Sequence, residues 1–321
     1  MKHAVMQRRA LLAAPALLAL PARAQPRFPD RPVTIIVPFV AGGSTDVVMR
    51  ALAEAAGKRL GQPVLVENRP GAGSSLGPAA VARARPDGYL LTEMPNSAIR
   101  LTFLQRLSYD VLRDFTPVVH LTGYLFGIIV KKDARWRNWG EFVAEARANP
   151  GKLTIGNAGT NGTPHLGALE LAQRAGIELL HVPYRGEAES AQAVLGGHVD
   201  AAATTALGGA MVTDGMARWL NTWTAERTRK WPETPTLREL GYDMVVSGPY
   251  GLVGPAGMPA EVTRTLHDAF RDAMQDPSHL AVMDRFDMNV DYKNSADYAA
   301  FLHQVVPQEQ ELIRRLGLKP E

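Results

Sequence analysis

Short apolar runs alternate along the chain with longer segments in which apolar side chains recur every three or four residues. The run at 33–39 fits a strand. In the next segment, 44–60, Val48 and Leu52 share one face of a helix that Gly61 would end. This alternation predicts an α/β protein with largely parallel sheets. The same reasoning predicts strands at 63–67, 89–94, 125–130, 153–157, 179–183, 199–204 and 251–254, and helices at 139–148, 164–175, 187–195, from 259 onward and at 296–316.

The chain is longer than one compact core usually holds. It has 321 residues, whereas a single domain commonly has about 100–200. A second series of strands and helices starts near Tyr124, and a polar, proline-bearing stretch at 226–235 is typical of a surface or crossing loop. We therefore predict two α/β lobes.

The first 24 residues have the anatomy of a secretory signal. Basic residues at positions 2, 8 and 9 precede an apolar stretch at 10–20, and the Ala-Arg-Ala sequence at 22–24 is a small-x-small cleavage signal. The apolar stretch is shorter than the ~18–20 residues that span a bilayer. The alternative interpretation is an ordinary buried helix. We expect cleavage after Ala24 and a mature protein in the periplasm.

Removal of that segment changes the charge of the chain. The full sequence has 35 basic and 32 acidic residues. The segment through Ala24 carries four of the basic residues and no acid, which leaves 31 against 32, a net charge of −1. The high isoelectric point of the full chain therefore gives no indication of nucleic-acid binding, and no run of lysine or arginine follows the signal segment.

The composition offers little for catalysis or metal binding. The chain has no cysteine and its histidines are scattered without a ligand spacing, so we expect no metal and no cofactor. Residues 73–77 match the pattern G-x-S-x-G of a nucleophilic serine. That pattern requires a strand directly before the serine, whereas residues 68–72 separate the strand from it. A glycine-rich turn onto a short helix is the better interpretation, and we predict no catalytic residue.

The first loop with binding chemistry lies at 38–46, between the first strand and the first helix. Its two glycines allow a sharp turn, and Ser44 or Thr45 fits the helix cap. A helix N-terminus offers free N–H donors and partial positive charge, which suit a carboxylate. Asp46 fits either the first helical turn or a pocket acceptor for an amine or hydroxyl. The candidate ligand-binding residues here are Phe39, Val40, Ala41, Gly42, Gly43, Thr45 and Asp46.

A second loop, at 157–165, repeats this design in the other half of the chain. Thr163 fits an N-cap with Pro164 at the first helical position. His165 has two interpretations, a base or metal ligand, or a hydrogen bond at the helix start, and we favour the second. Two such helix starts, one per lobe, predict a cleft that holds a ligand between the lobes. The candidate residues are Gly159, Thr160, Asn161, Gly162, Thr163 and His165.

A third strand-to-helix turn, at 183–186, contains Arg185. Its guanidinium could pair with a ligand carboxylate. An equally good interpretation is a solvated surface arginine. We keep Arg185 as a candidate ligand-binding residue.

Five segments together resemble one known family. They read FPDRPVTIIVPFVAGGSTDVVMRALAE, LGQPVLVENRPGAGSSLG, ARARPDGYLL, VPYRG and GGHVD. This combination resembles the Bug-type receptors, the periplasmic substrate-binding proteins of tripartite tricarboxylate transporters. The resemblance implies a type II periplasmic-binding-protein fold whose chain crosses twice between lobes. Lobe one would then comprise 25–122 and 248–321, and lobe two 123–247, with hinges near 121–123 and 246–248.

Two segments depart from the family's usual pattern. Thr204 and Thr205 stand where members often carry an Asp-Asn pair, and residues 93–96, which end at Asn96, stand where small polar residues are usual. Both segments line the variable end of the pocket in such proteins. Asn96, Thr204 and Thr205 therefore complete the candidate site, while the two loops would hold a ligand carboxylate.

The residues and the resemblance together predict a receptor and not an enzyme. It would be a monomer that captures a small carboxylate, whether a di- or tricarboxylate, an amino acid or an aromatic acid, for membrane transporter subunits. One alternative is a subunit that presents its ligand to a two-component sensor. Another is an enzyme on the same two-lobed scaffold. Genomic neighbours would separate transporter from sensor, and turnover assays would separate enzyme from binder.

Overall fold

The computed structural model describes residues 28–320, so the predicted signal segment lies outside the described residues. The strands are β1 (Val33–Val37), β2 (Val64–Asn68), β3 (Leu90–Glu93), β4 (Phe115–Gly123), β5 (Gly127–Lys131), β6 (Thr154–Ala158), β7 (Leu180–Tyr184), β8 (Ala201–Thr204), β9 (Ala217–Thr222), β10 (Pro249–Pro255) and β11 (Val290–Lys293). The helices are α1 (Ser44–Leu60), the 3₁₀ helix η1 (Ala72–Ser74), α2 (Leu76–Ala82), α3 (Asn96–Leu104), α4 (Trp139–Ala148), α5 (Thr163–Ala175), α6 (Glu187–Leu195), α7 (Ala206–Thr213), α8 (Ala260–Ala273), α9 (Pro277–Arg285) and α10 (Ser295–Arg315).

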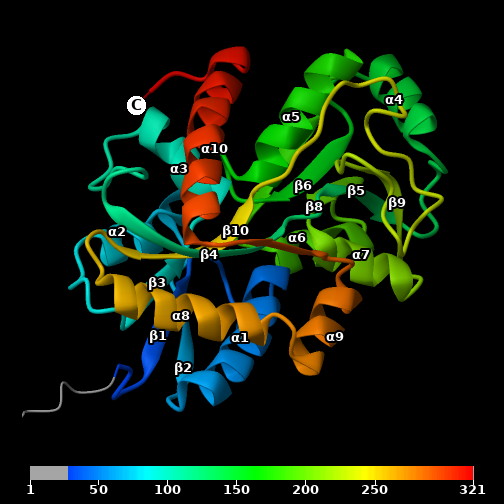
Figure 1. Ribbon diagram of the computed structural model, residues 1–321. Helices are drawn as coiled ribbons and strands as arrows, with labels where there is room; N and C mark the ends of the chain where they lie inside the picture. Colours follow the sequence, from blue (N-terminus) through cyan, green and yellow to red (C-terminus); the bar gives the residue numbers. More distant parts are fainter. Residues whose placement is uncertain (1–27, 321) are drawn as a thin grey trace, which may run out of the picture.

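These elements form two α/β lobes, each built on its own sheet (Figure 1). The six-stranded sheet has the order β11-β4-β10-β3-β1-β2, and the five-stranded sheet has the order β7-β6-β8-β5-β9. The chain leaves the first sheet after Gly123, enters the second at Gly127, and returns between Thr222 and Pro249. The two-lobed fold is as predicted from the sequence. The lobe boundaries at 122/123 and 247/248 stay a prediction.

The sheets are mixed, so the expectation of largely parallel sheets is wrong. β1 pairs in parallel with β2 and β3, and β6 with β7 and β8. The strands beside the crossings run the other way: β10 is antiparallel to β3 and β4, and β5 to β8 and β9. The physical reason is that these strands carry the chain into and out of each lobe, whereas parallel pairing needs a helical crossover between the paired strands.

The first lobe buries the strands and helices that the apolar pattern predicted. Val33, Ile35 and Val37 of β1 are fully buried, and α1 ends at Gly61, whose φ of 68° is the left-handed conformation that glycine adopts without steric cost. α8 lies along α1 on the same side of the sheet (Figure 1) and contributes Leu266 to this core.

The second lobe has an aromatic core. The Trp139 and Phe142 rings of α4 are stacked, with centroids 5.5 Å apart, and both are buried. Trp223, at the start of the return crossing, is fully buried against α5. A Cβ atom at Gly167 of α5 would come within 2.3 Å of the Trp223 ring, so only glycine fits there. This close packing fixes the return crossing to the lobe.

Several elements were missed by the sequence analysis because their patterns are atypical. β4 contains the buried polar residues His120 and Thr122, and β9 contains Arg218 and Asn221, so neither shows an apolar run. Helix α7 begins in a run of small apolar residues without helical periodicity. The other missed elements are α3, α9 and β11.

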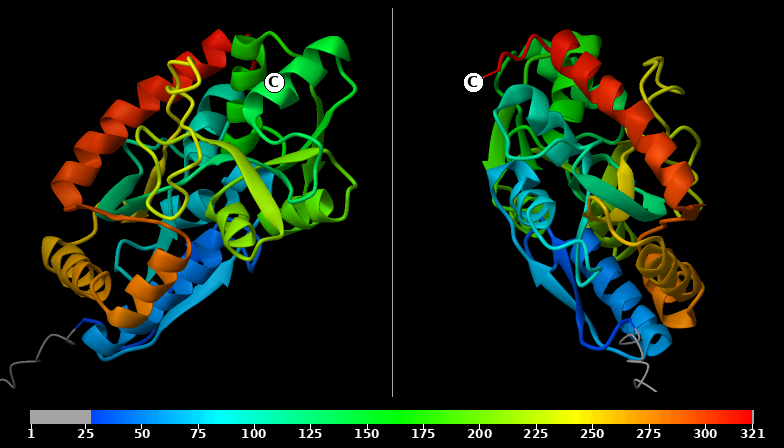
Figure 2. Two further views of the ribbon diagram at one scale, coloured as in Figure 1. Left: turned by 90° about the vertical axis from the view of Figure 1, so that its right-hand side faces the viewer. Right: turned by 60° about the vertical axis from the view of Figure 1, so that its left-hand side comes forward.

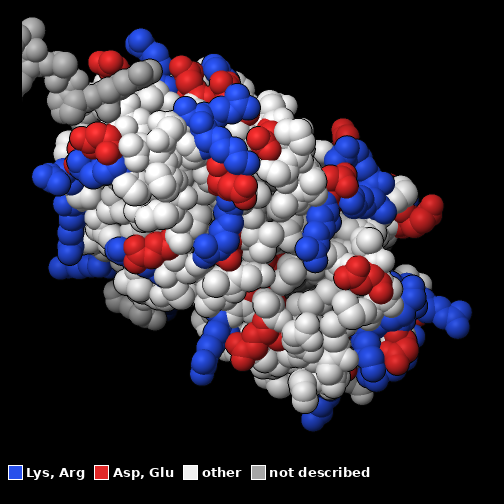
Figure 3. Space-filling model, turned by 90° about the horizontal axis from the view of Figure 1, so that it is seen from below, with Lys and Arg blue, Asp and Glu red and all other residues white. Residues whose placement is uncertain are grey.

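α10 runs along one side of the molecule, beside the return crossing (Figure 2). No helix within residues 28–320 has the length and hydropathy needed to cross a bilayer. Basic and acidic side chains are interspersed on the face that Figure 3 shows. That face therefore has no extended patch of one sign.

Candidate ligand-binding cleft

A cavity of about 230 Å³ lies between the two lobes. Its walls are the loops that follow β1, β2 and β3 in the first sheet and β6, β7 and β8 in the second. In α/β proteins, ligands characteristically bind at the carboxyl ends of parallel strands. The two interlobe crossings complete the cavity with Tyr124, Phe126 and Gly248.

The cavity brings together most of the residues that the sequence singled out. The predicted residues that line it are Phe39, Val40, Gly43, Thr45, Asn96, Gly159, Thr160, Gly162, Thr163, Arg185 and Thr205. The first loop, the second loop and the third turn therefore meet at one place, although they come from three separate parts of the chain.

Asp46, Gly42 and Ala41 do not line the cavity. The carboxylate of Asp46 accepts the Gly42 N–H at 2.9 Å and an Asn68 side-chain N–H at 2.9 Å, and it pairs with Arg50 at 3.0 Å. Burial alone would raise the pKa of Asp46, but these bonds bring it below its usual value. Asp46 therefore lies in the first turn of the helix, where it fixes the shape of the loop, and not in the pocket as an acceptor for an amine or hydroxyl.

His165, Asn161 and Thr204 also lie outside the cavity lining. Nδ1 of His165 accepts the Asn161 N–H at 3.2 Å, and its ring packs edge-on against His181 at 4.9 Å. Burial, with the nearby charge of Arg100, lowers the pKa of His165, which favours the neutral ring that this bond needs. His165 thus makes the hydrogen bond at the helix start. No cluster of three potential metal ligands occurs within residues 28–320.

Five helices begin at the cavity, and none of them has a side-chain cap. They are α1, α3, α5, α6 and α7. Of the other helices, α4, α9 and α10 are capped by Asn138, Asp276 and Asn294, whereas α2 and α8 also lack a side-chain cap. The predicted caps, Ser44 or Thr45 and Thr163, were wrong by one or two residues, because glycines 43 and 162 hold the N-cap positions of α1 and α5. A glycine cap has no side chain of its own to accept the N–H donors of the first turn.

The side chain of Glu187, at the start of α6, hydrogen-bonds to the starts of two other helices, α1 and α7. Glu187, the first residue of α6, accepts the Thr205 N–H at 2.9 Å and hydroxyl bonds from Thr204 and Thr205. Its other oxygen accepts the Ser44 hydroxyl at 3.1 Å and the Ser44 N–H at 3.4 Å. Glu187 therefore joins the start of α7 in the second lobe to the start of α1 in the first.

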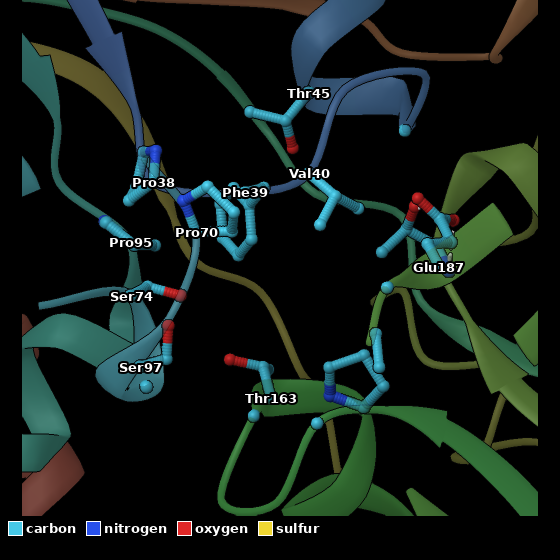
Figure 4. A pocket seen from close by; sticks show the side chains of 18 of the residues that line it. Pro38, Phe39, Val40, Thr45, Pro70, Ser74, Pro95, Ser97, Thr163 and Glu187 are labelled. Carbon is cyan, nitrogen blue, oxygen red and sulfur yellow. Dashed lines mark hydrogen bonds between the residues drawn. The ribbon is translucent and has the colours of Figure 1, made fainter. Parts of the chain in front are cut away.

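Unpaired hydroxyls gather on the other side of the cavity. Figure 4 shows the side chains of Ser74, Ser97 and Thr163 there, away from Glu187. Ser97 and Thr163 are only 6% and 8% exposed, yet neither hydroxyl bonds to any of the residues 28–320. Oδ1 of Asn96, also buried, has no partner in that part of the chain either. Asn96 and Ser97 lie at the start of α3 in the first lobe, and Thr163 lies at the start of α5 in the second.

The remaining wall of the cavity is apolar. Phe39, Val40 and Pro70 lie on the first-lobe side (Figure 4). The rings of Tyr124 and Phe126 are stacked at 5.5 Å where the chain first crosses between lobes. A ligand with an apolar body and few polar groups matches such a lining.

A buried acid supports the cavity from behind. Glu93 is fully buried, and one of its oxygens accepts the Tyr124 hydroxyl at 3.2 Å. The same hydroxyl lies 3.2 Å from the Thr45 hydroxyl. Burial raises the pKa of Glu93 well above its usual value, because it removes water from around the charged form. The network ties β3, the crossing and the start of α1 together.

The sequence predicts a turn onto a short helix after β2, and not a nucleophile elbow. In the structure, η1 and α2 follow this glycine-rich turn. Ser75 is buried and donates its hydroxyl to the Ala72 carbonyl at 2.8 Å, between η1 and α2. The turn nevertheless lines the cavity with Pro70, Gly71 and Ser74. The sequence analysis missed these residues, although a glycine-rich loop after a parallel strand is the signal that identified the other two loops.

The fold and the cleft define a class of protein: two mixed α/β sheets joined by two crossings, with a cavity between them, form a type II periplasmic-binding-protein fold. A family model described as "Tripartite tricarboxylate transporter family receptor" matches residues 48–318. The chain belongs to this family, whose members include the Bug proteins.

Similar proteins agree with this assignment. A Cupriavidus necator protein named "UPF0065 protein in gbd 5'region" is 42% identical over 310 residues, which cover 96% of this chain and 95% of that one. The solved periplasmic binding protein BugD is 31% identical with a TM-score of 0.86, covering 92% of this chain and 100% of that one. MatC from Rhodopseudomonas palustris, solved with bound malate, is 26% identical with a TM-score of 0.82, covering 89% and 100%.

Proposed function

We propose that this protein is a periplasmic solute receptor that binds a small carboxylate in the interlobe cavity and delivers it to a tripartite tricarboxylate-type membrane transporter. The observation that carries the proposal is the pair of uncapped helix starts, α3 and α5, that face the cavity with free hydroxyls. Backbone N–H groups at helix starts, with partial positive charge, stabilise a carboxylate.

Further support comes from the wall and from a relative. The apolar side chains of the cavity suit the carbon skeleton of such an acid. MatC was solved with malate, a small carboxylate. The protein would be exported, with cleavage after Ala24, and would perform no turnover, because the proposed site contains donors and apolar contacts but no activated nucleophile.

The ligand is best identified from protein purified without denaturation. Mass spectrometry of the released small molecules should find a carboxylate at a stoichiometric level. Calorimetry with that compound should then give lower affinity for Ser97→Ala and Thr163→Val, each by about fivefold to tenfold for one lost hydrogen bond. Thr265→Val on α8 removes a hydroxyl outside this cavity and should leave the affinity unchanged. Unchanged affinity in all three variants would remove this end of the cavity from the site.

A further inference from the structure

The two ends of the cavity differ in what they offer an anion. At one end, the donors at the starts of α1 and α7 already bond to Glu187. At the other end, the starts of α3 and α5 have no such internal partner. The difference bears on which carboxylates the proposed receptor accepts, and any selectivity inferred from it rests on the proposed function.

The Glu187 end is occupied by a fixed negative charge. The carboxylate is half-buried, lines the cavity, and accepts bonds from Ser44, Thr204 and Thr205. A second carboxylate placed here would meet like charge and would find these donors already used. Like charges in a partly buried site repel more strongly than they do in water.

The opposite end is open to a carboxylate. Ser97 is 94% buried and its hydroxyl is unpaired within the described chain, and Thr163 faces it from the other lobe (Figure 4). Here α3 has nine residues and α5 has thirteen, so both are long enough to carry a helix dipole. One carboxylate therefore has a place in the cavity, and it lies away from Glu187.

Arg185 is the one cationic side chain in the cavity lining, and its charge would favour a second carboxylate at this end. It is exposed, and its guanidinium makes no hydrogen bond or ion pair with residues 28–320. Water and salt weaken the attraction of an exposed cation for a ligand. The half-buried Glu187, with five bonds that hold it in place, should therefore dominate this end.

We propose that Glu187 is a specificity-determining residue that restricts the receptor to monocarboxylates. The ligand carboxylate would bind at the Ser97 and Thr163 end. The far end of the ligand would be uncharged or positively charged, as in an aliphatic acid, a hydroxy acid or an ω-amino acid.

Two series of compounds with matched chain length test this proposal. They are 6-aminohexanoate, hexanoate and adipate, and 4-aminobutanoate, butanoate and succinate. Within a series the number of carbon atoms is constant, and the far end is an ammonium, a methyl or a carboxylate group. Calorimetry on the wild-type protein should place the dicarboxylate last in the series that fits the cavity, by about tenfold or more.

The variant Glu187→Gln keeps the shape and a hydrogen-bond acceptor but removes the charge. It should raise dicarboxylate affinity about tenfold and leave the monocarboxylate within about twofold. Glu178→Gln removes the same charge from an exposed position of the second lobe outside the cavity lining, and should change neither affinity. Circular dichroism of each variant checks that it is folded.

Three results would overturn the inference. Equal binding of dicarboxylate and monocarboxylate by the wild type, unchanged in Glu187→Gln, would leave the proposed function standing without this selectivity. Tight dicarboxylate binding that Arg185→Gln abolishes would assign the far end to the arginine. Failure of every compound to bind to both wild type and Glu187→Gln would count against the proposed function as well.

Discussion

Glu187 on α6 and Ser44 on α1 are 143 positions apart in the chain, yet the Glu187 carboxylate accepts both the hydroxyl and the N–H of Ser44 across the interlobe cleft. The Ser44 hydroxyl also lies 2.7 Å from that of Thr205. These bonds connect the lobes directly, without a ligand between them. They should therefore hold part of the unliganded population in a closed form.

Glu187→Ala should open the unliganded protein. The substitution removes every bond between Glu187 and Ser44. The closed form therefore becomes less stable relative to the open form, and the open population increases. Small-angle scattering should give a larger radius of gyration for the unliganded variant than for the unliganded wild type. With saturating ligand the two radii should agree, and both should be smaller than without ligand. Identical unliganded radii would show that these bonds do not influence closure.

Gly43→Asp should weaken binding without unfolding the protein. A Cβ atom at Gly43 has room, since the nearest atom outside its neighbours is Oε2 of Glu187 at 3.7 Å. The added carboxylate would then repel Glu187 and place a second negative charge at the α1 start. Repulsion between the two carboxylates should break the bonds from Ser44 to Glu187 and disfavour closure around the ligand, so we expect affinity for the retained carboxylate to fall about tenfold or more. Gly43→Ala should stay within about threefold; equal losses in both variants would point to steric blocking instead of charge.

Arg100 should contribute strongly to stability. Its buried guanidinium donates to Glu309 of α10 at 2.7 Å and to the Asn161 carbonyl of the second loop at 2.9 Å. Arg100→Ala leaves Glu309 buried without its partner, which typically costs about 3–5 kcal/mol. Chemical denaturation measures this loss. Arg314→Ala breaks the exposed pair with Glu311 on the same helix and should cost less than about 1 kcal/mol. Similar losses would contradict the assigned role of burial.

His120 should make the protein less stable in mild acid. Its ring is 1% exposed; Nδ1 donates to the Asp291 carbonyl at 2.6 Å, and Nε2 accepts the Tyr250 N–H at 3.4 Å. Burial first, and the charge of Lys293, lower the pKa of His120 to about 4, although both the carbonyl bond and the carboxylate of Asp291 act in the opposite direction.

The unfolded chain therefore binds this proton at a higher pH than the folded protein does. His120 contributes its full effect above pH ~6.5, and this is lost as the pH falls toward about 4, by at most ~1.4 kcal/mol per unit. Urea denaturation at several pH values should show that slope, and His120→Asn should reduce it. Exposed His303→Asn is the control. A slope that His120→Asn leaves intact would assign it to other groups.

The sequence predicted the parts of the cleft that rest on local chemistry. A glycine-rich turn between an apolar strand and an amphipathic helix identifies a helix start at the end of a parallel strand, and the loops holding Gly43 and Gly162 were found in this way. The same signal at Gly71 and Gly73 predicts only a turn onto a short helix, because residues 68–72 separate the strand from the serine pattern at 73–77.

Long-range contacts explain what the sequence analysis missed. Glu187 looks like an ordinary acid in a helix's first turn, and its partners Ser44 and Thr205 are known only once the lobes are assembled. Ser97 is the second residue of a helix that is buried nearly all round, so the sequence shows no amphipathic period there. The buried polar side chains of β4 hydrogen-bond to residues far along the chain. One of these is Asn289, whose carbonyl accepts the Thr122 hydroxyl at 2.6 Å.

The central claim is that one carboxylate binds between the starts of α3 and α5. The most direct test is a crystal structure of the protein with the retained ligand or with hexanoate bound. We predict carboxylate oxygens within hydrogen-bond distance of the Ser97 and Thr163 hydroxyls, with Glu187 still bonded to Ser44. A carboxylate bound at Gly43 and Ser44 with Glu187 displaced, or one paired with Arg185 at the rim, would contradict the account.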